Sequence, residues 1–199
     1  MDETFFRVAT ALAFVSALGM SAYFRTRAQV KGGKLRSSAG QRPVFGLRLL
    51  GLAILVPVIG YIANPDWVAW ARFDAPTWLR LIAVGVGAIN TMLVLWMYRS
   101  LDTNVSPVEE ARENATLITT GPYRWIRHPL YTFGMISMLT LTFMTAIWWI
   151  GVLALPLIAF FILWRVPREE AKLIEVFGDA YRDYMRRTGR FIPKLPMSA

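Results

Sequence analysis

The chain has 199 residues, of which 55% are hydrophobic and only 18% are charged, against about 25% charged residues in soluble domains. It contains no cysteine and one histidine, which excludes disulfides, thiolate nucleophiles and cysteine-based metal sites and argues against a histidine-based one, so we expect no metal. In a soluble protein, a net charge of +9 would suggest that the protein binds nucleic acid. Here the basic residues lie beside apolar segments, which indicates membrane topology and contact with a lipid bilayer, and no nucleic-acid partner.

Three apolar segments in the first half of the chain, residues 5–24, 44–62 and 79–98, are each long enough to cross a bilayer core of about 30 Å as a helix. The first follows acidic residues and has no clear cleavage site, so we interpret it as a retained helix and not a signal peptide. The loop 25–42 holds six basic residues and no acid, which places it in the cytoplasm and the N-terminus outside. We expect Pro57 to kink the second helix.

Two further apolar runs, residues 131–147 and 148–164, follow each other with almost no spacer. Each is at the short end for a membrane span, and we interpret the pair as a tight helical hairpin with a kink at Pro156. Trp148 and Trp149 suit the outer membrane interface, where aromatic side chains gather.

The tail from residue 165 has apolar residues at helical spacing along one stripe, which predicts an amphipathic helix that ends near Gly189. The predicted fold is all-α: a polytopic integral membrane protein with five transmembrane helices, the last two a tight hairpin, and a cytoplasmic C-terminal amphipathic helix. The only sizeable polar segments, 99–130 and 165–194, lie on the same predicted side of the membrane. A site built from both would take a water-soluble cofactor from the cytosol and a lipophilic substrate from the bilayer.

The stretch GPYRWIRHPLY, residues 121–131, contains the only histidine of the chain. His128 precedes Pro129, which favours an extended backbone at His128, and Pro129 suits the first turn of the helix that follows. The start of that helix would present free N–H groups to a carboxylate or a phosphate. The alternative is an interfacial turn in which Arg124 and Arg127 extend their charged ends to water.

A second group of charged residues lies in RVPREEAKLIEVFGDAYRDY, residues 165–184. Arg165 and Glu169 are four residues apart and share a face if the helix is continuous, although Pro167 lies between them. The alternative is that Arg165 obeys the positive-inside rule, while Glu169 and Glu170 complement the dipole at a helix start.

The segment ATLITTGPYRWIRHPLY, followed some forty residues later by REEAKLIEVFGDAYRDYMRRTGRFIP, resembles the isoprenylcysteine carboxyl methyltransferase family and the related bacterial phospholipid methyltransferases. The resemblance covers roughly residues 99–195. It implies that S-adenosylmethionine is the methyl donor and that the cytoplasmic loop, the start of the fourth helix and the tail bind it. We therefore expect a single domain over residues 1–199, in which 1–98 form three spans and 99–199 form the cofactor-binding and catalytic part.

The resemblance also implies roles for individual residues. Catalytic roles fall to Arg165, which matches the substrate-facing arginine, and to Glu169, which matches the acid that contacts the donor. The expected donor-binding residues are Ala115, Thr116, Leu117, Ile118, Tyr123, His128, Pro129, Leu130, Tyr131 and Glu169. Ala115 departs from the family pattern, because many members carry histidine at that position.

These residue types suit the chemistry of the donor. Glu169 would pair with a cationic part of S-adenosylmethionine, and His128 with the helix start would face its carboxylate. Leu117, Ile118 and Tyr131 would bracket the adenine. Arg165 would orient an anionic acceptor with its planar guanidinium. The expected activity is methyl transfer to a lipophilic, anionic acceptor, similar to an isoprenylcysteine α-carboxylate, at the membrane–cytosol interface of the cell inner membrane or its equivalent.

Two other functions stay open at this point. Membrane sterol and enone reductases also carry a segment similar to RHPLY and bind NADPH, although they are usually about twice as long. A non-enzymatic membrane protein that binds anionic lipid would explain the basic loops but not the two motifs together. The acceptor is also open between a prenylated cysteine, a lipid amine, and a small thiol or acid.

Overall fold

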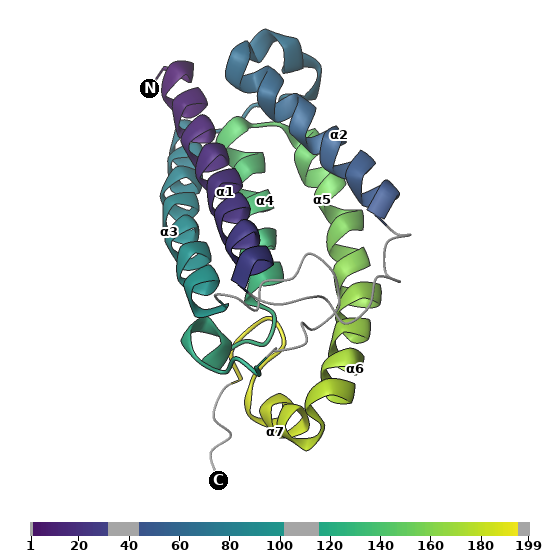
Figure 1. Cartoon of the computed structure of the whole chain (residues 1–199). Coiled ribbons are helices and arrows are strands. Elements are labelled where there is room, and N and C mark those ends of the chain that lie inside the picture. The colour runs from purple at the N-terminus through teal and green to yellow at the C-terminus, as the bar shows by residue number, and fades with distance from the viewer. Residues whose placement is uncertain (1, 32–43, 102–115, 195–199) are drawn as a thin grey trace. The chain divides into compact units, whose positions relative to one another are not determined.

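The computed structural model describes residues 2–31, 44–101 and 116–194, and all the regular elements within these ranges are helical (Figure 1). The main helices are α1 (Glu3–Lys31), α2 (Val44–Ala63), α3 (Thr77–Leu101), α4 (Pro129–Thr145), α5 (Trp148–Phe160), α6 (Val166–Phe177) and α7 (Asp179–Arg187). Three short elements join them: the 3-10 turns η1 (Pro65–Ala71) and η3 (Gly121–Arg124), and the π-helical turn η4 (Phe161–Arg165). Sheet-type pairing in these ranges is limited to two isolated bridges.

Within the described residues, three helices are long and apolar enough to cross a membrane: Glu3–Val30, Thr77–Leu101 and the stretch Trp148–Phe177. The described apolar part of α2, Leu49–Ala63, is shorter, and α4 has 17 residues. Large apolar side chains are exposed along these helices, as expected where the solvent is lipid. The all-α membrane fold is therefore confirmed, whereas the count of five spans stays a prediction.

The predicted hairpin corresponds to α4 and α5, which are separated only by Ala146 and Ile147. Ala146 makes the turn with a φ of 56°, in the left-handed region that side chains other than glycine rarely adopt. α4 begins at Pro129, as the sequence predicts, because the missing N–H of proline costs nothing in a first turn.

The tail differs from the single amphipathic helix that we expected. It forms two helices, α6 and α7, which are divided at Gly178. Gly178 has a φ of 56°, and its backbone N–H donates to the carbonyl of Ile174 at 2.8 Å, which ends α6. The apolar stripe does continue across the break, because Tyr181 and Tyr184 of α7 are buried.

The chain forms two compact units, each built from three separate stretches of sequence. Unit 1 comprises residues 1–19, 41–92 and 134–160, and unit 2 comprises residues 20–40, 93–133 and 161–199. The sequence-based division at residue 98 is a different grouping and stays a prediction.

Unit 1 encloses an apolar cluster and a partly buried ion pair. The fully buried members of the cluster include Phe6, Val58 and Ile150. Beside them the guanidinium of Arg80, 7% exposed, donates to both carboxylate oxygens of Glu3 at 2.9 Å. Charged side chains in an apolar helix are costly unless they are paired, and this pairing holds α3 to the start of α1.

The same carboxylate has two more partners in unit 1. The hydroxyl of Tyr61 donates to Glu3 at 2.6 Å, and the Arg72 guanidinium lies 3.1 Å from Glu3 Oε2. Glu3 therefore connects α1 to α2, to α3 and to the segment that follows η1.

Candidate functional site

The segment that leads into α4 is folded by a glycine turn. Gly121 has a φ of 60°, and a Cβ at this position would lie 2.1 Å from Ser100 Oγ, so only glycine fits here. Pro122 is buried directly after it in η3. The carbonyl of Tyr123 then accepts a hydrogen bond from the buried hydroxyl of Tyr184 at 2.6 Å. Burial raises the pKa of the Tyr184 phenol, so this group stays a neutral donor at physiological pH.

Residues 125–128 pair through their backbone with the segment that follows α7, which we call the terminal segment (residues 188–194). The N–H of Gly189 donates to Trp125 O at 3.2 Å, and the N–H of Arg127 donates back to Gly189 O at 2.8 Å. The N–H of His128 donates to Arg190 O at 3.1 Å. The extended backbone before Pro129, which the sequence predicts, therefore makes a short parallel contact with the end of the tail.

Glycine is also required in the terminal segment. A Cβ on Gly189 would lie 1.7 Å from the carbonyl oxygen of Ile192, which is a backbone atom that cannot rotate away. Thr132, in the first turn of α4, donates through Oγ1 to Phe191 O at 2.9 Å. The terminal segment is thus held against the start of α4 as well as against the loop before it.

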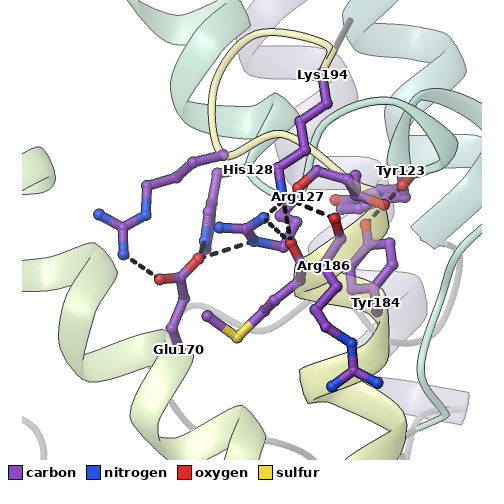
Figure 2. Close-up of polar contacts among 10 residues, drawn as sticks. Tyr123, Arg127, His128, Glu170, Tyr184, Arg186 and Lys194 are labelled. Atoms are coloured by element: carbon purple, nitrogen blue, oxygen red, sulfur yellow. Dashed lines mark hydrogen bonds and ion pairs between the residues drawn. The ribbon is translucent and has the colours of Figure 1, made fainter. Parts of the chain in front are cut away.

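Glu170 lies at the centre of a charged cluster formed by these segments (Figure 2). It is 3% exposed, and its Oε1 lies 3.0 Å from Arg127 Nε and 3.2 Å from His128 Nε2. Its Oε2 accepts from Arg190 of the terminal segment. One buried carboxylate on α6 therefore connects the loop motif to the end of the tail.

Arg127 also contacts the end of α7. Its Nη1 donates to Met185 O at 3.1 Å and to the carbonyl of Thr188, so it satisfies carbonyls that the helix leaves unpaired. The interfacial alternative, in which this arginine extends into water, is wrong, because its side chain is only 8% exposed. Arg124 is exposed and remains compatible with that alternative.

A second polar group joins α4 to the junction between α5 and α6. Arg165 Nε donates to the hydroxyl of Tyr131 at 2.9 Å, and this hydroxyl donates to Glu169 Oε2 at 2.7 Å. The Tyr131 ring lies against Phe161, with centroids 5.0 Å apart. Arg165 is the last residue of the π-turn η4, and single π-turns inside α-helices are frequent at functional sites.

The other predicted donor-binding residues differ in how exposed their side chains are. Leu117 and Ile118 are half-buried in an irregular stretch, Thr116 at its start is exposed, and Leu130 is 45% exposed. Ala115 lies outside the described residues.

A family model described as phospholipid methyltransferase matches residues 78–180, which is more than half of the chain. The chain belongs to the phospholipid methyltransferase family.

Several relatives of this family member are identified by sequence. Over 132 residues the chain is 30% identical to the cobalt-zinc-cadmium resistance protein CzcN of Cupriavidus metallidurans, covering 64% of this chain and 56% of that protein. Over 148 residues it is 27% identical to protein-S-isoprenylcysteine O-methyltransferase of Dictyostelium discoideum, covering 71% of this chain and 60% of that protein. The chain thus spans less than two thirds of the length of these relatives.

The fold of this family member is similar to that of a eukaryotic intramembrane Ras methyltransferase, isoprenylcysteine carboxyl methyltransferase. The TM-score is 0.61 at 23% identity, and the alignment covers 93% of this chain and 67% of that one. This match, together with the three apolar helices, identifies the phospholipid methyltransferase family member as an integral membrane protein.

Sequence reasoning missed Glu170 and Arg190 as members of the site of this family member. A signal for Glu170 was present, because it lies three, four and seven residues before Leu173, Ile174 and Phe177 and so on the apolar stripe of the tail helix. An acid on an apolar stripe requires a buried partner. Nothing in the sequence indicates which arginine supplies it.

Proposed function

We propose that the protein is an S-adenosylmethionine-dependent methyltransferase that acts on a lipophilic, anionic acceptor at the membrane–cytosol interface. The observation that carries this proposal is the Tyr131 hydroxyl, which hydrogen-bonds both the Arg165 guanidinium and the Glu169 carboxylate. An anion-binding group and a cation-binding group are thereby joined through one phenol. Membership in the phospholipid methyltransferase family supports methyl transfer as the reaction.

The side chains present in unit 2 fit this donor. S-adenosylmethionine has a sulfonium and an ammonium cation, a carboxylate and an adenine ring. The half-buried Glu169 suits one of the cations, and the Tyr131–Phe161 pair offers aromatic faces to adenine or to the sulfonium. When bound, this donor supplies an activated methyl group on a positively charged sulfur atom.

The surroundings of Arg165 support the proposed class of acceptor. A guanidinium recognises a carboxylate with two parallel hydrogen bonds, which favours an anionic acceptor over a lipid amine. The side chain of Leu163, in the same π-turn, is 76% exposed, and Phe161 lies 6.0 Å from the Arg165 guanidinium. An apolar tail in the bilayer and an anionic head at Arg165 describe the class of acceptor, of which an isoprenylcysteine carboxylate is one example.

The roles of the chain's own groups are binding and orientation. Glu169 holds the donor, Arg165 holds the acceptor, and Tyr131 fixes the relative position of the two charged groups. Positioning of this kind lowers the barrier by removing the entropy cost of bringing two reactants together. The basic loop 25–42 supports a cytosolic location for this site and an outside N-terminus, in the inner membrane or its equivalent.

Two measurements on the purified full chain test the proposal. Calorimetric titration should show binding of S-adenosylmethionine and not of NADPH, and Glu169→Gln should weaken it while Glu175→Gln, an exposed position on the same helix, should not. Incubation with radiolabelled donor and total membrane extract should label an acidic lipophilic compound. Binding of NADPH alone would support a reductase, and a labelled amine or small thiol would contradict the anionic acceptor.

A further inference from the structure

Glu170 has an arrangement of partners that goes beyond holding the tail in place. We propose that Glu170 is a positioning residue, which holds His128 in the tautomer that carries its hydrogen on Nε2 and leaves Nδ1 as an acceptor. The contact is the 3.2 Å approach of His128 Nε2 to Glu170 Oε1, between two side chains that are 3% and 4% exposed.

The direction of this hydrogen bond follows from the other partners of the carboxylate. Arg127 and Arg190 both donate to Glu170, and two guanidiniums around one buried carboxyl group favour its ionised form. An ionised carboxylate only accepts hydrogen bonds. The nitrogen of His128 that faces it must therefore be the donor, and in the neutral ring the other nitrogen is the acceptor.

The backbone of His128 and its ring have further contacts. Its backbone N–H is bonded to Arg190 O at 3.1 Å, and the rings of Tyr131 and Phe191 lie against it with centroids 5.7 Å and 6.0 Å away. Glu170 thus sets both the orientation and the tautomer of the imidazole.

The proposed tautomer also bears on donor binding, and this part of the inference rests on the proposed function. An Nδ1 acceptor binds an N–H group, so His128 would recognise an amino group of the donor, either its ammonium or the amine of adenine. We had expected His128 to face the carboxylate of the donor, which requires a nitrogen that donates. The proposed tautomer predicts the opposite contact, and the measurement below distinguishes the two.

The single histidine of the chain makes a direct test feasible, because histidine labelled with ¹⁵N reports only on His128. In the full-length protein in detergent micelles, without any added donor, the nitrogen signals should show a protonated Nε2 and an unprotonated Nδ1. In Glu170→Gln the amide offers both a donor and an acceptor, so a mixture of the two tautomers is expected. Glu175→Gln, at an exposed position of α6, should keep the wild-type pattern.

The outcomes separate this inference from the proposed function. A wild-type ring with hydrogen on Nδ1, or on both nitrogens, would overturn the inference, as would an unchanged pattern in a folded Glu170→Gln protein. If Glu170→Gln does not fold, the wild-type spectrum alone decides. For the folded variant we also expect the Kd of S-adenosylmethionine to rise about tenfold. A correct tautomer in a protein that binds no S-adenosylmethionine would refute the proposed function and leave the inference standing.

Discussion

Tyr131 donates a hydrogen bond of 2.7 Å to Glu169, a residue 38 positions later in the chain. The first comes from the initial turn of α4 and the second from the initial turn of α6. Arg165 also donates to the Tyr131 hydroxyl, so one oxygen atom contacts both the Arg165 guanidinium and the Glu169 carboxylate.

Replacement of Tyr131 by phenylalanine removes only that hydroxyl. We expect the Kd of S-adenosylmethionine to rise about tenfold and the turnover to fall, because Glu169 and Arg165 both lose a partner. The free energy of unfolding should fall by about 1 kcal/mol. Tyr23→Phe is the matched control, since Tyr23 is 58% exposed on α1, and it should change neither quantity. A Tyr131→Phe protein with wild-type kinetics would refute the role of the hydroxyl.

Substitutions at the two charged partners should have separable effects. Glu169→Gln should raise the Kd of the donor about tenfold or more, since it removes a charge that faces a cation. Arg165→Lys keeps the charge and loses the planar fork, so kcat for the acceptor should fall or its KM should rise while the donor Kd stays nearly unchanged. Titration calorimetry and steady-state kinetics measure the two effects, and the assignment is wrong if both variants affect the same constant.

Gly189→Ala should disorganise the terminal segment. The added Cβ would meet the carbonyl oxygen of Ile192 at 1.7 Å, so the backbone that pairs with residues 125–128 must move. We expect a loss of several-fold in donor affinity and about 2 kcal/mol in stability, as is typical of a backbone clash. Gly134→Ala in α4 is the control, because a Cβ there meets nothing within 4 Å and should be tolerated. Equal thermal stability of the two variants would contradict the expected clash.

Glu3→Gln should destabilise unit 1 without affecting the donor site. It removes the charge that faces Arg80 and Arg72, at a cost of about 2 kcal/mol, below the range for fully buried pairs because the Glu3 side chain keeps 28% exposure. Thermal unfolding in detergent measures this change, and Asp74→Asn, at an exposed position of the same unit, serves as the control. No change in unfolding temperature would show that the ion pair contributes nothing to stability.

Membrane sidedness is tested with single cysteines, because the natural chain has none. Cysteines at Ser38 and Ala69 should react with a membrane-impermeant maleimide from opposite sides of the membrane, Ser38 from the cytosol and Ala69 from outside. Reaction of both from the outside would refute the predicted orientation.

The sequence predicts where the main apolar helices lie, because long uninterrupted apolar runs favour helices of membrane-spanning length. The start of α4 at Pro129 was also predictable, since proline restricts the residue before it and suits a first turn. The break at Gly178 was not predicted, because the apolar stripe of the tail continues through Tyr181. The pattern therefore looks the same for one helix as for two. Periodicity alone does not distinguish one helix from two with aligned faces.

The contacts within the candidate site were anticipated in part, while the roles of its residues stay predictions. Resemblance to a known family directed attention to His128, Tyr131, Arg165 and Glu169, and the structure brings Tyr131, Arg165 and Glu169 into direct hydrogen-bond contact. The partner of His128 is Glu170, for which the sequence had suggested only an alternative role at a helix dipole. Neighbouring acids on a helix point in directions about 100° apart, so two adjacent glutamates serve two different clusters.

The contact between residues 125–128 and the terminal segment also determines when the site forms during synthesis. Arg127 bonds to Met185, which is 58 residues later in the chain, and the backbone of His128 bonds to Arg190. A ribosome that has just completed the RHPLY motif has not yet made these partners. The motif can become ordered only after α4, α5 and the tail have been synthesised, so a nascent chain arrested before residue 188 should expose unpaired backbone N–H groups at Arg127 and His128 and be a substrate for membrane quality control.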